Sequence, residues 1–158
     1  MFQLVELSFS QSYDCMILVH PQIQMLDELS DKLQSRGIAH FNISQKLSSA
    51  LITLSTTERG RFAEKWLKDT LGGLYKNPIL CTHPDLLFHP SLEIDPFTLF
   101  CQAARFRQMI VLWPGEYSIH TLSYAVPEHH HYRIWKISDF LLIQPKILIY
   151  QISTKQGA

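Results

Sequence analysis

The chain has 158 residues, of which 46% are hydrophobic and 18% are charged, and its formal net charge is +0. This length and composition suit a single folded domain with a sizeable core, and they exclude a chain that is disordered throughout. Without net positive charge, a strong general attraction to nucleic acid or to an anionic membrane is not expected. No apolar run approaches the roughly 18 residues that span a bilayer, and the first residues lack the basic start of a secretory signal. We therefore expect a cytoplasmic protein without membrane contact, with one domain over residues 1–152 and a disordered tail over residues 153–158.

The first half of the chain alternates between short apolar runs and helical patterns. Residues 1–10 alternate weakly and fit a short helix and an edge strand equally well. After them, the apolar residues form a continuous run where a buried strand is expected, and they recur at steps of three or four where a helix is expected. The expected order is strand, helix, strand, helix, helix, at Cys15–Val19, Gln22–Ser35, Ile38–Ile43, Gln45–Leu54 with Ser44 as its cap, and Thr57–Tyr75.

The centre of the chain predicts a βαβ unit. Two apolar runs, Ile79–Cys81 and Met109–Trp113, suit buried strands, and Pro96–Phe106 between them has helical spacing. Asp95 before Pro96 is a good helix start, because a capping side chain precedes a residue with fixed φ. A strand, a helix and a strand in this order are expected to give parallel strands with a right-handed crossover.

These patterns predict a three-layer α/β fold with a mainly parallel sheet. The strands at Cys15–Val19, Ile79–Cys81 and Met109–Trp113 should be central, because strands that are apolar on both faces need cover on both faces. Beyond Gly115, shorter strands are expected at His120–Ala125, Tyr132–Ile137 and Lys146–Gln151. The three cysteines, Cys15, Cys81 and Cys101, lie in apolar contexts and are expected to be buried thiols.

The turn after the first strand is where a phosphate-binding loop would lie in a nucleotide hydrolase of this topology. Such a loop needs glycines, a lysine for the phosphates and a hydroxyl residue for magnesium. The turn from Val19 to Met25 contains none of these, and Pro21 removes a backbone donor. The sequence therefore favours a protein with no catalytic residues and no cofactor.

Several residues near the expected strand ends have two interpretations each. Asp85 suits a magnesium ligand or a turn cap, and His129 and His131 suit a metal site or a polar loop, for which we expect no metal. Arg105 and Arg107 suit a helix C-terminus or a contact with phosphate or carboxylate. Trp113 suits a partner-binding anchor or a lid over the core.

The carboxyl ends of parallel strands meet at one edge of a sheet, where ligands and partners usually bind. We therefore expect the partner-binding surface at this edge. Its candidate residues are Asp85, His89, Arg105, Arg107, Trp113, His129, His131 and Arg133, with the loop Glu128–His131.

A series of short motifs runs from Tyr13 to Ile137. They are Tyr13, Asn42-Ile43, Asp85-Leu86-Leu87-Phe88, Pro90-Ser91-Leu92, Asp95-Pro96, Arg105, Arg107, Trp113 with Gly115, Leu122, Tyr124-Ala125, Pro127, His129 and Tyr132-Arg133. In order and spacing they resemble the BrxF-like family, the small P-loop-type proteins of type-three BREX phage-defence systems.

The resemblance implies a P-loop NTPase-like topology and a role in antiviral defence. Typical members carry a glycine-rich loop after the first strand, whereas here the Walker motif is degenerate. The resemblance therefore implies a non-catalytic subunit of a BREX-type complex, a scaffold kept for protein–protein contacts. Its expected partners are other proteins of the same system, while an indirect association with DNA and self-association stay open.

Two alternative functions follow from the same residues. In a divergent NTPase, Asp85 would hold magnesium, and Arg105 or Arg107 would contact phosphate. In a nucleic-acid-binding module, the contacts would come from the arginines at 59, 61, 105, 107 and 133.

Overall fold

A computed structural model describes residues 14–74, 78–125, 129–137 and 146–153. Its elements are β1 (Cys15–His20), α2 (Ile23–Ser35), β2 (Ala39–Asn42), α3 (Ile43–Leu51), α4 (Thr56–Gly72), β3 (Ile79–Thr82), the 3-10 turns η1 (Asp85–Phe88) and η2 (Pro90–Leu92), α5 (Pro96–Ala103), β4 (Met109–Ser118), β5 (Thr121–Tyr124), β6 (Arg133–Lys136) and β7 (Ile147–Gln151). The predicted piece at residues 1–10, residues 154–158 of the predicted tail 153–158, and Glu128 of the predicted loop lie outside these ranges. Within them, no helix is both long and apolar enough to cross a membrane.

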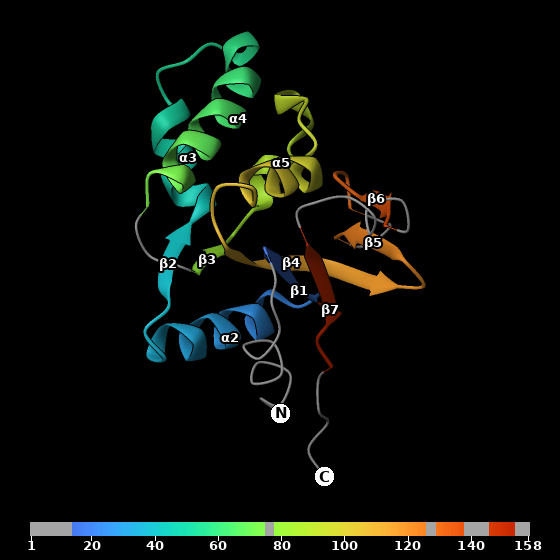
Figure 1. Cartoon of the computed structure of the whole chain (residues 1–158). Helices are drawn as coiled ribbons and strands as arrows, with labels where there is room; N and C mark the ends of the chain where they lie inside the picture. The colour runs from blue at the N-terminus through green and yellow to red at the C-terminus, as the bar shows by residue number, and fades with distance from the viewer. Residues whose placement is uncertain (1–13, 75–77, 126–128, 138–145, 154–158) are drawn as a thin grey trace.

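The five strands β2, β3, β4, β1 and β7 form a parallel sheet in that order. Figure 1 shows α2 on one side of this sheet and α3, α4 and α5 on the other. The prediction of an α/β fold with a mainly parallel sheet is confirmed, and the three strands expected at the centre are the central ones. Helices cover both faces of these strands, which explains why β1, β3 and the first part of β4 are apolar without alternation.

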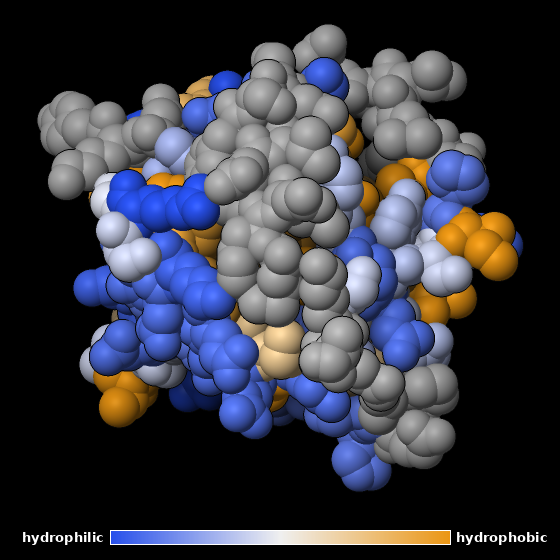
Figure 2. Space-filling view, turned by 90° about the horizontal axis from the view of Figure 1, so that it is seen from below, coloured by the Kyte–Doolittle hydropathy of each residue, from blue (hydrophilic) through white to orange (hydrophobic). Residues whose placement is uncertain are grey.

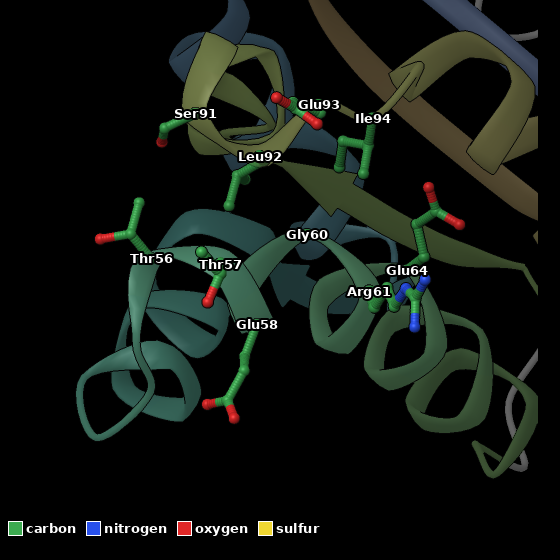
Figure 3. A pocket seen from close by; sticks show the side chains of 10 residues that line it. All are labelled: Thr56, Thr57, Glu58, Gly60, Arg61, Glu64, Ser91, Leu92, Glu93 and Ile94. Carbon is green, nitrogen blue, oxygen red and sulfur yellow. The ribbon is translucent and has the colours of Figure 1, made fainter.

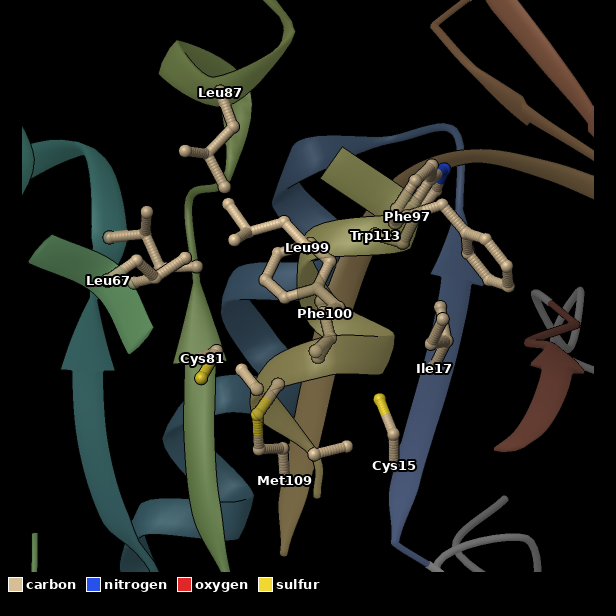
Figure 4. Packing of buried hydrophobic residues seen from close by; sticks show 14 of the residues in the cluster. Cys15, Ile17, Leu67, Cys81, Leu87, Phe97, Leu99, Phe100, Met109 and Trp113 are labelled. Carbon is tan, nitrogen blue, oxygen red and sulfur yellow. The ribbon is translucent and has the colours of Figure 1, made fainter. Parts of the chain in front are cut away.

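The larger core cluster lies between the sheet and the helices α3, α4 and α5. Figure 4 shows Phe100 of α5 among side chains from β1, β3 and β4, including Cys15, Cys81 and Met109. These side chains are fully buried. Burial keeps both thiols protonated, and it raises the pKa of Cys81 to about 12. All three cysteines are free thiols; Cys15 and Cys81 are buried as predicted, whereas Cys101 is half-buried.

The smaller core cluster lies between the sheet and α2. Leu26, Leu29 and Leu33 of α2 pack on Met16, Leu18, Leu80, Ile110 and Leu112 of the strands. The spacing of these three leucines follows the helical period, so the opposite face of α2 is left for polar residues. Figure 2 shows that the outward surface over α2 is mainly hydrophilic.

The strand β4 is longer than predicted and belongs to two sheets. Its first part pairs in parallel with β1 as far as Pro114. Its second part, from Gly115 to Ser118, pairs antiparallel with β5, which pairs in turn with β6. A Cβ atom at Gly115 would lie 1.8 Å from the carbonyl oxygen of Ser123, so only glycine permits this close pairing.

The β4–β5 hairpin closes through two residues in the left-handed region. Ile119 has φ 49° and His120 has φ 56°. A two-residue hairpin turn with positive φ normally uses Asn or Gly, because a Cβ atom makes this conformation costly. Ile119 is also 91% exposed, so no packing of its side chain offsets that cost.

Several helix boundaries differ from the prediction: α3 is Ile43–Leu51 and not Gln45–Leu54, and α4 is Thr56–Gly72 and not Thr57–Tyr75. The helix α3 begins at Ile43, and its cap is Asn42, whose Oδ1 accepts the N–H of Gln45 at 3.0 Å. Ser44 is not the cap, because its hydroxyl donates to the carbonyl oxygen of His83 instead. The helix α5 ends at Ala103 and not at Phe106, whereas its predicted cap Asp95 is confirmed by a 3.1 Å bond from the N–H of Thr98.

Candidate functional site

Five of the candidate partner-binding residues lie close together around β5, β6 and the turns after β3. They are Asp85, His89, His129, His131 and Arg133. The other three candidates, Trp113, Arg105 and Arg107, lie elsewhere, and each has a structural reason.

Trp113 is not on a surface. It is fully buried, its Nε1–H donates to the carbonyl oxygen of Ser123 at 2.9 Å, and its ring lies 4.9 Å from that of Phe88 and 5.3 Å from that of Trp135. The strands β5 and β6 fold back over the end of β4 and cover this side chain. Of the two predicted roles, the structure therefore supports the core role, and the anchor role is wrong.

Arg105 and Arg107 do not reach the carboxyl edge of the sheet. Both follow α5 and directly precede Met109, the first residue of β4, so they lie near the amino end of that strand. A helix that joins two parallel strands returns the chain to the amino edge, which explains this position. Arg107 donates from Nε to the carbonyl oxygen of Leu71 at 3.2 Å, near the end of α4, and Arg105 is exposed.

Three histidines gather where the turns after β3 meet the segment before β6. The ring of His131 lies 5.0 Å from that of His89 and 5.3 Å from that of His129, between ring centroids. Partial desolvation lowers the pKa of His131, and the neighbouring imidazoles of His89, His129 and His130 lower it further, with His89 having the largest effect of the three. We call His89, His129 and His131 the histidine cluster.

Asp85 connects the histidine cluster to the sheet. Its Oδ1 accepts the hydroxyl of Tyr124 at 3.0 Å, and the ring of Tyr124 stacks on Phe88 at 3.7 Å and approaches His129 at 5.9 Å. Burial, with the nearby carboxylate as a second cause, raises the pKa of Tyr124. Asp85 therefore orients a tyrosine. Its side chain does not cap η1, so the predicted cap role of Asp85 is wrong.

In the β1–α2 turn, a backbone donor that could bind a phosphate group is already bonded within the chain. His20 is buried, and its Nδ1 accepts the N–H of Gln22 at 2.9 Å, so this donor is not available to a phosphate. Pro21 has no N–H. The turn connects β1 to α2 through only two residues, which leaves no loop that could wrap a phosphate group.

A polar chain that sequence reasoning missed crosses the same edge of the sheet. Thr82 ends β3, and its Oγ1 lies 2.6 Å from Nε2 of His40 on β2 and 2.9 Å from Nδ1 of His83. Nε2 of His83 lies 3.3 Å from Oδ1 of Asp27 on α2. Thr82 is only 2% exposed, so its hydroxyl is committed to these contacts. We call these four residues the His40–Asp27 chain.

Ser44 holds the backbone at the centre of this chain. Its N–H and its hydroxyl both donate to the carbonyl oxygen of His83, and its Oγ accepts the N–H of Leu86 at 3.1 Å. His83 needs this support because it has φ 53°, in the left-handed region.

A small hollow and a large one lie at different places in the described part of the chain. The small one, about 20 Å³, lies at the carboxyl edge between Asp27, His83, Asp85 and apolar side chains, and it has room for roughly one water molecule. The large one, about 640 Å³, lies between the start of α4 and η2. Figure 3 shows Leu92 pointing toward Gly60 within it, with Thr56 and Thr57 at one end and Arg61 and Glu64 at the other. The carboxylates of Glu58, Glu64 and Glu93 against one guanidinium make it unsuited to a polyphosphate.

No group of three or more His, Cys, Asp or Glu within the described part of the chain is arranged to hold a metal ion. Three of the five arginines proposed for nucleic-acid contacts bind backbone carbonyl oxygens: Arg59 that of Leu54, Arg107 that of Leu71 and Arg133 that of Ile94.

The His40–Asp27 chain had one indication in the sequence. Thr82-His83-Pro84-Asp85 directly follows an apolar strand, and this position is where polar site residues are expected in a parallel sheet. His40 and Asp27 had no such indication, because they reach Thr82 and His83 from positions 42 and 56 residues earlier in the chain.

Protein-family models, curated proteins and solved structures were compared with the chain, and none of them matches it.

Proposed function

We propose that this protein is a non-catalytic subunit of a BREX-type anti-phage complex, with a P-loop NTPase-like fold that has lost its phosphate loop and acts through protein–protein contacts. The order of motifs along the chain supports the family. The parallel sheet, with β1 between β4 and β7, is compatible with a fold in which a phosphate loop would follow β1.

The observation that carries the proposal is the β1–α2 turn. Nucleotide binding at this position needs free backbone N–H groups and a lysine. Here the N–H of Gln22 is bonded to the ring of His20, and the turn contains no lysine. The hollow beside it is too small for a nucleotide, and the larger groove is acidic.

The histidine cluster is the proposed contact surface. His89 and His129 are exposed and His131 is half-buried, and they lie next to Arg133 and the exposed Tyr132 at one end of the molecule. Aromatic and cationic side chains that lie together on a surface are typical of the centre of a protein interface.

The first experiment is a calorimetric titration of the purified protein with Mg-ATP. We expect no heat of binding. A dissociation constant in the micromolar range would refute the loss of nucleotide binding and favour the divergent NTPase.

The second experiment is co-expression of the tagged protein with the neighbouring genes of its operon, followed by quantification of the proteins that co-purify. We expect a stoichiometric partner. In the variant with His129→Ala and His131→Ala, the yield of the co-purified partner should fall several-fold. Arg105→Ala, near the opposite edge of the parallel sheet, should leave the yield of the partner unchanged. Equal yields from both variants would remove the histidine cluster as the contact surface.

A further inference from the structure

The His40–Asp27 chain is a set of titratable groups that the proposed function does not use. One buried hydroxyl lies between two imidazoles, at 2.6 Å and 2.9 Å, and a carboxylate lies 3.3 Å from the far nitrogen of the second imidazole. The outer imidazole, that of His40, is exposed.

The carboxylate sets the direction of every hydrogen bond in this chain. Ionised Asp27 can only accept, so Nε2 of His83 carries the proton that it donates. In neutral His83, Nδ1 is then an acceptor, and the Thr82 hydroxyl donates to it. The Thr82 oxygen has only lone pairs left for His40, so Nε2 of His40 is the donor at the outer end.

We propose that His40, Thr82, His83 and Asp27 form a proton relay, in which a proton taken up by the exposed His40 ring is delivered to His83. The added proton binds Nδ1 of His40. The proton on its Nε2 passes to the oxygen of Thr82, and the original hydroxyl proton of Thr82 passes to Nδ1 of His83. His40 ends as the neutral Nδ1–H tautomer, Thr82 as a neutral hydroxyl, and His83 as a cation beside the anionic Asp27.

The backbone geometry holds the relay in place. Ser44 binds the carbonyl oxygen of His83 twice, and Thr82 is fixed by its pairing with Asn42 in the parallel sheet. The fold therefore sets the positions of the three atoms between which the protons move, which are Nε2 of His40, Oγ1 of Thr82 and Nδ1 of His83. Fixed positions reduce the structural reorganisation that proton transfer requires.

The relay holds one added proton and not two. The charged groups that face it are Asp27 from α2, Asp85 after β3 and the two rings themselves. Asp27 compensates a cation on His83, whereas a second cation on His40 would lie across a single hydroxyl from the first. Partial desolvation, and in second place the neighbouring His83, lower the pKa of the His40 ring, in agreement with this order.

The test is side-chain ¹H–¹⁵N NMR of the full chain between pH 8 and pH 5, with the histidines assigned by His→Gln substitutions. At pH 8 we expect His40 as the Nε2–H tautomer. On acidification, His83 should become doubly protonated while His40 stays neutral and changes to the Nδ1–H tautomer.

Substitutions at Thr82 and Asp27 separate the relay from two independent histidines. Thr82→Val removes the hydroxyl at almost constant volume, and it should abolish the tautomer change of His40, whereas Thr82→Ser should keep it. Asp27→Asn, at an exposed position, should shift the first proton away from His83. The proposal is overturned if His40 becomes doubly protonated before His83 in the natural protein, or if Thr82→Val leaves the tautomer change intact. It is also overturned if Asp27→Asn leaves the first proton on His83.

Discussion

Trp113 shows how one side chain joins the two sheets of this fold. Its ring packs against Phe88 and Trp135, and its indole N–H satisfies the carbonyl oxygen of Ser123 on β5. Replacement by alanine would leave a large cavity and remove the hydrogen bond to Ser123.

We expect Trp113→Ala to lower the free energy of unfolding by about 3–5 kcal/mol, the usual cost of removing a buried aromatic side chain. Urea denaturation followed by circular dichroism measures this. Trp113→Phe, which keeps most of the ring packing but loses the hydrogen bond, should cost clearly less. An unchanged midpoint for Trp113→Ala would contradict the core role.

For Ile119 we expect the opposite effect of a substitution on stability, because its exposed side chain makes no packing contacts that a substitution would remove. The left-handed backbone at Ile119 costs roughly 1–2 kcal/mol for a residue with a Cβ atom. Glycine removes this cost, but the greater conformational entropy that it gives the unfolded chain offsets about 0.5–1 kcal/mol of the gain. Ile119→Gly should therefore stabilise the protein slightly, by about 0.5 kcal/mol. Thr121→Gly, two residues later in β5, should destabilise it, and the two thermal midpoints measured together check the sign.

At the scale of elements, the contact between α4 and η2 depends on a single glycine. A Cβ atom at Gly60 would lie 2.1 Å from the carbonyl oxygen of Leu92, whereas one at Gly72, at the end of the same helix, would meet no atom within 4 Å. The two turns of chain can approach this closely only because Gly60 has no side chain.

Alanine substitutions at these two glycines should therefore have opposite effects. Gly60→Ala should destabilise the protein by about 1–3 kcal/mol, because η2 must move away from α4. Gly72→Ala should be neutral or stabilise it by up to about 1 kcal/mol, the helix preference of alanine over glycine. Unfolding curves of both variants give the comparison, and equal effects would contradict the predicted close approach.

The elements also show which parts of the fold the sequence could predict. The strands β1, β3 and the first part of β4 were predictable, because burial on both faces leaves continuous apolar runs. The start of α3 was not, because Asn42 and Ser44 are both good caps and the choice depends on His83, about 40 residues later. The length of β4 was also not predictable, because Pro114 and Gly115 usually end a strand. Here they mark the point where its partner changes from β1 to β5.

The candidate site was predictable only where a residue directly follows a strand. Asp85 and the histidines after β5 were found in this way. Trp113 was misplaced, because a strand end is exposed in most parallel sheets but is covered here by β5 and β6. The contacts of His40 with Thr82 were beyond sequence reasoning, since they depend on the register of β2 against β3.

At the scale of the whole molecule, stability should decrease on mild acidification. The pKa values of His40 and His131 are lowered in the folded protein, so the folded state binds these protons less readily than the unfolded chain. Their contribution is present in full above the unfolded value of about 6.5 and is lost as the pH falls through it.

Urea midpoints at pH 7.5 and pH 5.5 test this expectation. The natural protein should be less stable at pH 5.5, and a variant with His40→Gln and His131→Gln should lose less stability over the same interval. If the variant and the natural protein respond equally, other groups determine the pH dependence.

The membership of β4 in two sheets has a consequence for how the molecule opens. If β5 and β6 separate locally, the amides of Glu116 and Ser118 lose their partners on β5, whereas that of Tyr117 stays bonded to Oε1 of Gln151 on β7 and those of Ile110 and Val111 stay bonded between β1 and β3. Native-state hydrogen exchange in low denaturant should then report two opening free energies within one continuous strand, the smaller one in its second part. A single free energy along β4 would mean that both sheets open together. Two different opening free energies would mean that the β4–β5 hairpin and the surface next to it can open and close while the parallel sheet stays folded.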